Sequence, residues 1–158
     1  MLTDNRLFRA LCVLALAGAL VALTGCGGSD KKSGGSVADY KAGAQTAANN
    51  FKNSAQAASA KVSSATTPAN KVAGLEALKA SVSKAADDFA ALNPPANLKA
   101  DNAELVQEFR DLATTVNDVE DALKNNDQSK AAAALPKLTN LQTKIGATIA
   151  RIQQKVGV

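Results

Sequence analysis

Residues 98–126, LKADNAELVQEFRDLATTVNDVEDALKNN, form the stretch that decides the fold. Large apolar residues recur there every three or four positions, which is the spacing of one face of an α-helix. Asn125-Asn126-Asp127 follows and predicts a turn. The stretch therefore predicts a long amphipathic helix whose apolar face needs other helices to cover it. That face consists of Leu98, Leu105, Phe109, Leu112, Val116, Val119 and Leu123.

Two segments before this stretch show the same periodicity. The first, residues 37–65, follows Ser36, which together with Asp39 is similar to a capping box. Thr67-Pro68 then begins the second segment, with threonine as N-cap and proline as first helical residue. Asn93-Pro94-Pro95 ends it, because proline lacks the backbone N–H that would continue a helix. Two further helices are therefore expected before residue 98.

The last segment, residues 127–158, predicts a fourth helix that begins at the N-cap Asp127. Pro136 lies about two turns inside it, where we expect a kink or a broken first segment. Four amphipathic helices joined by short turns predict an all-α fold, specifically an antiparallel up-down-up-down four-helix bundle.

The composition supports an all-helical chain. Of its 158 residues 34 are alanine, the best helix former, and only 3% are aromatic. The apolar face of residues 37–65 is mostly alanine, so this helix must approach its neighbours closely or dock loosely. Gly43, Gly74 and Gly146 fall inside predicted helices, where each costs about 1 kcal/mol relative to alanine. Close contact with another helix is the expected compensation.

Opposite charges gather on the third and fourth predicted helices. Residues 98–126 contain three basic and seven acidic residues, whereas residues 127–158 contain five basic and one acidic residue. The two charged stripes are expected to face each other along antiparallel neighbours and to specify their pairing. The acidic stripe is Asp101, Glu104, Glu108, Asp111 and Asp118, and the basic stripe is Lys130, Lys137, Lys144 and Arg151.

The N-terminus predicts an export signal. Arg6 and Arg9 precede an apolar run from residue 10 to residue 23, which is shorter than the roughly 20 residues of a membrane span. A cleaved signal is therefore favoured over an uncleaved anchor. Leu23-Thr24-Gly25-Cys26 resembles the lipobox of bacterial lipoproteins. The resemblance implies cleavage between Gly25 and Cys26 and a diacylglyceryl group, a membrane anchor, on the Cys26 sulfur.

The predicted organisation is a signal peptide at residues 1–25, a lipidated cysteine with a flexible Gly/Ser tether at 26–36, and the bundle at 37–158. Cys12 would be lost with the signal, which leaves Cys26 as the single cysteine of the mature chain. Residues 37–158 resemble the small Ala-rich helical lipoproteins of actinobacteria, with Leu-Asn-Pro-Pro-Ala at 92–96 between two helices. That group implies no particular activity.

Few residues suggest chemistry, and we expect no enzyme, cofactor or metal. Histidine is absent, which removes the commonest general base and metal ligand. Glu104 and Glu108 lie one turn apart and could share a cation, but a solvated face opposite Lys144 or Arg151 is favoured. Tyr40 could cap a pocket, but a position with its hydroxyl at the rim of the bundle is favoured.

The isoelectric point of about 9.1 raises the question of nucleic-acid binding. We expect none, because the basic stripe has a predicted acidic partner, stacking aromatics are scarce and the predicted export signal would place the protein outside the cytoplasm. The sequence instead predicts a lipid-anchored lipoprotein on the extracytoplasmic face of the cell membrane. Its predicted role is a non-catalytic interaction module for an envelope protein. An apolar patch exposed on either of the first two helices would support this role.

Two alternatives remain open. One is a small apolar ligand in a cavity between the two Ala-rich helices, which would need a volume of about 300 Å³ or more. The other is a passive envelope component without a defined partner.

Overall fold

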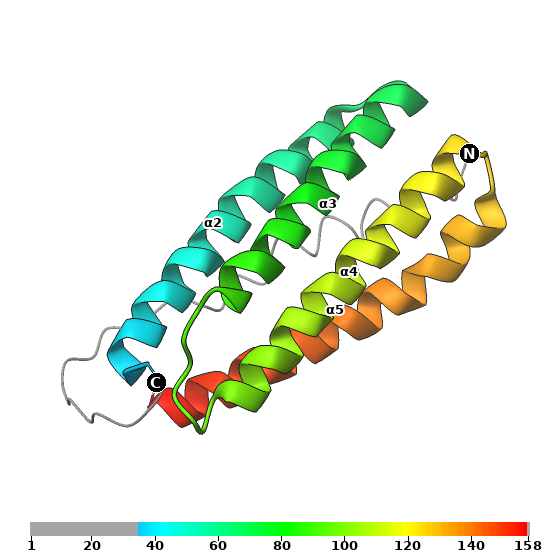
Figure 1. Ribbon diagram of the computed structural model, residues 1–158. Helices are drawn as coiled ribbons and strands as arrows, with labels where there is room; N and C mark the ends of the chain where they lie inside the picture. Colours follow the sequence, from blue (N-terminus) through cyan, green and yellow to red (C-terminus); the bar gives the residue numbers. More distant parts are fainter. Residues whose placement is uncertain (1–34, 158) are drawn as a thin grey trace.

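The computed structural model describes residues 35–157, and within that range the fold is all-α with four helices and no strand. Each helix packs mainly against the one before or after it in the chain. Figure 1 shows the helices as long rods, with the connections between them at the two ends of the molecule. The prediction of an all-helical chain with four helices is confirmed. The helices are α2 (Val37–Ser64), α3 (Pro68–Ala90), α4 (Lys99–Lys124) and α5 (Gln128–Val156).

The helix ends are set by the residues that the sequence indicated. The side chains of Ser36, Thr67 and Asp127 each accept a hydrogen bond from the backbone N–H three residues further along, at 3.0, 3.3 and 2.9 Å. α4 begins without such a side-chain cap. α5 ends at Gly157, whose φ of 73° lies in the left-handed region that favours glycine.

The core is built around Phe109 of α4. Its ring meets Phe51 of α2 edge to face at 5.2 Å and stacks on Phe89 of α3 at 5.6 Å. Leu112 and Val116, on the same face of α4, are fully buried. Six of the seven residues predicted for this apolar face are buried, and Leu123 packs against them as a partly buried side chain.

α2 approaches α3 closely, as its alanine-rich face predicts. A Cβ at Gly74 of α3 would lie 2.5 Å from Cγ2 of Val62 in α2, and one at Gly43 of α2 would lie 2.6 Å from Cδ2 of Leu92. Gly74 therefore allows the close helix contact that we expected, whereas Gly43 makes room for Leu92 in the connection that follows α3. The prediction is wrong for Gly146 of α5, where a Cβ would meet nothing within 4 Å.

α5 is continuous through Pro136, so the broken first segment is not observed. The four alanines at 131–134 favour the helical conformation on the N-terminal side of the proline. Ala131 and Ala134 are also buried in the core, which fixes this part of the helix.

Residues 1–34, which include the predicted signal peptide, Cys26 and most of the tether, lie outside the described residues. Within residues 35–157, none of the helices is apolar enough over a sufficient length to cross a membrane. Gly35 lies against Asn93 in the connection between α3 and α4, and a side chain there would collide with the Asn93 carbonyl. The chain therefore enters the folded domain beside this connection.

Candidate functional site

Buried polar groups concentrate between the start of α4 and the end of α5. Asp101 of α4 is almost completely buried and accepts hydrogen bonds from Lys155 Nζ at 2.6 Å and from Arg151 Nε at 3.4 Å. The bond from Lys155 is the main reason that the pKa of Asp101 lies below its usual range. We call Asp101, Glu104, Glu108, Thr148, Arg151 and Lys155 the α4–α5 polar cluster.

Arg151 links the solvent-exposed and buried parts of this cluster. Its Nη2 donates to Glu104 Oε2 at 2.5 Å and to Thr148 Oγ1 at 2.9 Å. Thr148, which is completely buried, in turn donates to Glu108 Oε1 at 3.2 Å. The chain of contacts ends at Glu108.

Glu108 is a buried carboxyl group with an incomplete set of partners. Its side-chain atom Oε2 has no hydrogen bond to any described residue. Burial raises the pKa of Glu108, and the charge of Glu104 adds to that effect, while Thr148, Arg151 and Lys144 oppose it. The expected solvated position for Glu108 is therefore wrong. Within residues 35–157, no group of three or more His, Cys, Asp or Glu side chains is placed to hold a metal ion.

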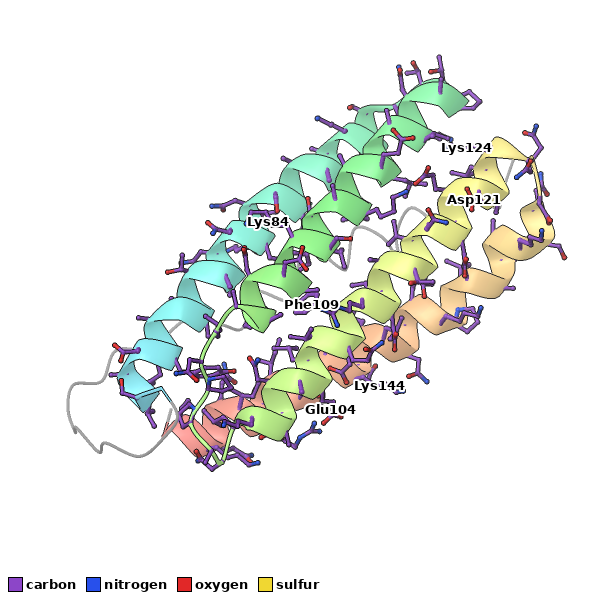
Figure 2. The ribbon with its side chains drawn as sticks, viewed as in Figure 1. Lys84, Glu104, Phe109, Asp121, Lys124 and Lys144 are labelled. Carbon is purple, nitrogen blue, oxygen red and sulfur yellow. The ribbon has the colours of Figure 1, made fainter. Side chains whose placement is uncertain are left out.

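The predicted facing of the charged stripes is correct at Arg151 and at Lys137 and wrong for the other members of the stripes. Asp101 and Glu104 pair with Arg151, and Asp118 approaches Lys137 at 4.0 Å. The other predicted residues act differently. Lys130 pairs within its own helix end with Asp127, Asp111 accepts from Gln107, and Lys144 (Figure 2) has no ion pair with a described residue.

A second polar cluster, which the sequence did not suggest, joins α3 to the end of α4. Glu120 is buried and accepts from Lys79 Nζ at 2.7 Å and from Lys124 Nζ at 2.5 Å. Burial alone would raise the pKa of Glu120, but the two lysines outweigh it and lower that pKa. Lys124 also reaches Glu76 of α3 at 3.3 Å, and Figure 2 shows it near the end of α4. This cluster fixes how α3 and α4 align.

Tyr40 of α2 is buried, so its expected position at the rim is wrong. Its hydroxyl donates to Asn102 Oδ1 at 2.9 Å, and Asn102 Nδ2 donates to the carbonyl of Phe89 at 3.0 Å. Burial, together with the charge of Asp101, raises the pKa of Tyr40 to about 12. Tyr40 and Asn102 therefore connect α2, α3 and α4 at one end of the molecule.

A small cavity lies beside Tyr40. It has a volume of about 20 Å³, enough for one water molecule, and its walls are almost entirely apolar. α2 and α5 provide most of the lining, with Phe89 and Leu105 between them. The cavity is thus between the first and last helices of the described chain, and not between α2 and α3 as expected. Its volume is far below that of a pre-formed ligand pocket.

No family model, curated protein or solved structure matches this chain in comparisons with known proteins. The class that the fold defines is therefore the broad one of small all-helical domains, and any function must be argued from the residues themselves.

Proposed function

We propose that the protein is a lipid-anchored bacterial envelope protein that presents its domain outside the cytoplasmic membrane. The Leu23-Thr24-Gly25-Cys26 motif after the apolar run at residues 10–23 supports the anchor. Two acyl chains on Cys26 would hold the protein stably, since one chain gives only marginal binding. The contact of Gly35 with Asn93 supports an orientation in which this end of the domain lies nearest the membrane.

We infer further that the helices form an antiparallel up-down-up-down bundle. The ion pairs support this topology, because the start of α4 pairs with the end of α5 through Asp101 and Lys155. Toward the opposite end, Asp118 of α4 lies near Lys137 in the first half of α5. The contact of Tyr40 with Asn102, which also binds the last turn of α3, supports the same arrangement for α2 and α3.

The proposed role of the domain is to bind another envelope protein. The observation that carries this role is the outward face of α2. Between residues 42 and 60 its single charged residue is Lys52, whereas α4 carries ten charged residues in 26. Depletion of charge is typical of the core of a protein interface. The expected apolar patch is absent from the described surface, where Val37 is the single exposed large apolar residue, so the partner must offer a neutral polar surface.

Metabolic labelling with an alkyne-tagged fatty acid tests the anchor. The wild type and Cys12→Ser should be labelled, because Cys12 is removed with the signal. Cys26→Ser should lose the label and the membrane association. Label that persists in Cys26→Ser would disprove lipidation at this residue.

A photo-cross-linking amino acid placed at Asn53 tests the partner. Asn53 is exposed on the neutral face of α2, and Arg110, exposed on the charged helix α4, provides the matched control. In intact cells we expect one discrete protein adduct at position 53 and none at position 110. Equal adducts at both positions, or none at either, would count against an interface on α2.

A further inference from the structure

α5 is held in the domain chiefly by α4. Of the described helices, only α4 lies close to α5 along its length, and Figure 1 shows the two side by side. The apolar side chains that α5 contributes to the core are covered less completely than those of α4. Ile152 and Val156 retain 8% exposure, whereas Leu105 of α4 retains 1%. The docking of α5 therefore depends on its contacts with α4.

The ion pairs between α4 and the last turns of α5 are partly solvated. The side chains of Arg151 and Lys155, which both pair with Asp101, are 42% and 43% exposed. Ion pairs whose partners reach solvent contribute little to stability, because water screens them and long side chains lose freedom when they pair. The buried contacts between the two helices must therefore hold α5 in place.

One of these buried contacts contains an ionisable group. Two turns from the pair of Asp101 and Lys155, Glu108 meets Thr148, and both side chains are buried. The Thr148 hydroxyl donates to Oε1 of Glu108, while Oε2 has no hydrogen-bond partner among the described residues. The site suits a neutral carboxyl group better than a carboxylate, because a buried charge is costly unless hydrogen bonds satisfy it.

The charged groups around Glu108 do not supply the missing partner. Glu104, one turn earlier on α4, repels a carboxylate at this position, whereas Arg151 and Lys144 of α5 attract one. Arg151 already donates to Glu104 and Thr148. Lys144 is exposed and forms no ion pair with a residue in the range 35–157. Burial outweighs the attraction by the two cations, so the pKa of Glu108 is raised.

We propose that Glu108 is a pH-dependent switch that controls the docking of α5 on α4. While Glu108 is protonated, the second half of α5 lies closed on α4, as in this structure. When Glu108 ionises, this half of α5 separates from α4 more often, because water then reaches the carboxylate. Each opening uncovers apolar side chains of both helices. Because burial favours the protonated form, opening increases as the pH rises. The switch depends neither on the membrane anchor nor on a partner of α2.

Native-state hydrogen exchange of the full chain in mild detergent, followed by mass spectrometry, tests the switch. Protection is corrected for the intrinsic exchange rate at each pH and is compared between peptides from residues 145–156 and peptides from α3. Between about pH 5 and about pH 8, protection of residues 145–156 should fall about tenfold in the wild type. Low concentrations of urea should hardly change it, because a local opening exposes little surface, whereas protection of α3 should fall steeply with urea.

Two variants assign the effect to one carboxyl group. Glu108→Gln keeps the shape of the side chain without its charge, so the protection of residues 145–156 should be the same at both pH values. Glu104→Gln is the matched control, because it removes an exposed carboxylate one turn away on the same helix. This control should keep the tenfold fall of the wild type.

Three outcomes would overturn the proposal. The first is protection of residues 145–156 that does not change with pH in the wild type. The second is an equal fall in Glu108→Gln. The third is the same steep urea dependence for residues 145–156 as for α3, since exchange would then require unfolding of the whole domain. If Glu108→Gln fails to fold, as judged by helical circular dichroism, Glu108→Met provides a second uncharged variant for the same comparison.

Discussion

Replacement of Glu108 by methionine should stabilise this protein, and increasingly so as the pH rises. Glu108 is 6% exposed, Thr148 satisfies one of its oxygens, and the other has no partner among the described residues. A buried acceptor without a partner costs about 1–3 kcal/mol, and a charged one costs more. Methionine has a similar length and no charge. In the variant Thr148 still accepts from Arg151 but loses the acceptor of its own hydroxyl hydrogen, which offsets part of the gain.

The direction of the pH effect follows from the raised pKa of Glu108. A group whose pKa is higher in the folded state stabilises the fold while it is protonated, and this contribution is lost as the pH rises through the folded-state value. At about pH 4, where the folded protein holds Glu108 protonated, Glu108→Met should change the free energy of unfolding by less than about 1 kcal/mol. At about pH 8 it should increase that free energy by about 1–3 kcal/mol.

Urea unfolding followed by helical circular dichroism at both pH values measures these differences. Glu104→Met is the matched control, because Glu104 lies one turn away, pairs with Arg151, which also donates to Thr148, and has a half-exposed side chain. It should lower stability by about 0–1 kcal/mol, with no gain at high pH. The reasoning would be refuted if Glu108→Met destabilised the protein at about pH 8 or changed its stability equally at both pH values.

Three further measurements test other parts of the structure. Gly74→Ala should lower the free energy of unfolding in urea by about 1–3 kcal/mol despite the better helix propensity of alanine, because the new Cβ would lie 2.9 Å from the Val62 backbone nitrogen. Gly146→Ala, where a Cβ meets nothing, should raise that free energy by about 0.5–1 kcal/mol. Equal effects of the two substitutions would contradict the packing of α2 on α3. Because the pKa of Asp101 is lower in the folded protein, the ionised carboxylate stabilises the fold at pH values above the ordinary aspartate pKa. This contribution is lost as the pH falls through the lowered folded-state pKa. Asp101→Asn should therefore lower the free energy of unfolding in urea at neutral pH. The loss should be only about 1 kcal/mol, because Arg151 and Lys155 are half-exposed, and it should be smaller in acid. In a spectrophotometric titration Tyr40, the single tyrosine, should ionise with a pKa of about 12, and a midpoint near the ordinary value of 10.0 would show that it is not buried.

Much of the fold follows from short-range sequence signals. The N-caps at Ser36, Thr67 and Asp127 were identifiable because each depends on one side chain and a backbone N–H three residues away. The apolar face of α4 was identifiable because helical periodicity alone decides which residues share a face. Gly146 was interpreted incorrectly because helix–helix distance depends on which face of α5 points outward at that level, and local sequence does not determine this.

The polar contacts were only partly predictable, and the reason lies in spacing. A seven-residue period found Lys137 and Arg151 but missed Lys155, which lies one helical turn after Arg151 on the same face. Thr148 lies one turn before Arg151, so a step of three or four residues would have found both. Asn102 falls between Leu98 and Leu105 at positions of the same apolar face, which is a signal that this amide is buried.

Tyr40 and Glu108 illustrate what sequence alone leaves undetermined. Whether a tyrosine hydroxyl reaches the rim or a buried partner depends on a residue 62 positions away, Asn102. Whether a carboxylate is solvated depends on how tightly the neighbouring helix covers it, and α5 covers Glu108 with the small, buried Thr148. Both outcomes are properties of the assembled helices.

The distribution of charge distinguishes α2 from α4. α4 is fixed to α5 and to α3 by named ion pairs at Asp101 and Glu120, and such pairs specify register and resist sliding. α2 has few charges, relies mainly on alanine packing for its contacts, and is joined to α4 by the bond between Tyr40 and Asn102. A partner protein on the outward face of α2 would therefore act on the helix that is least constrained by charge.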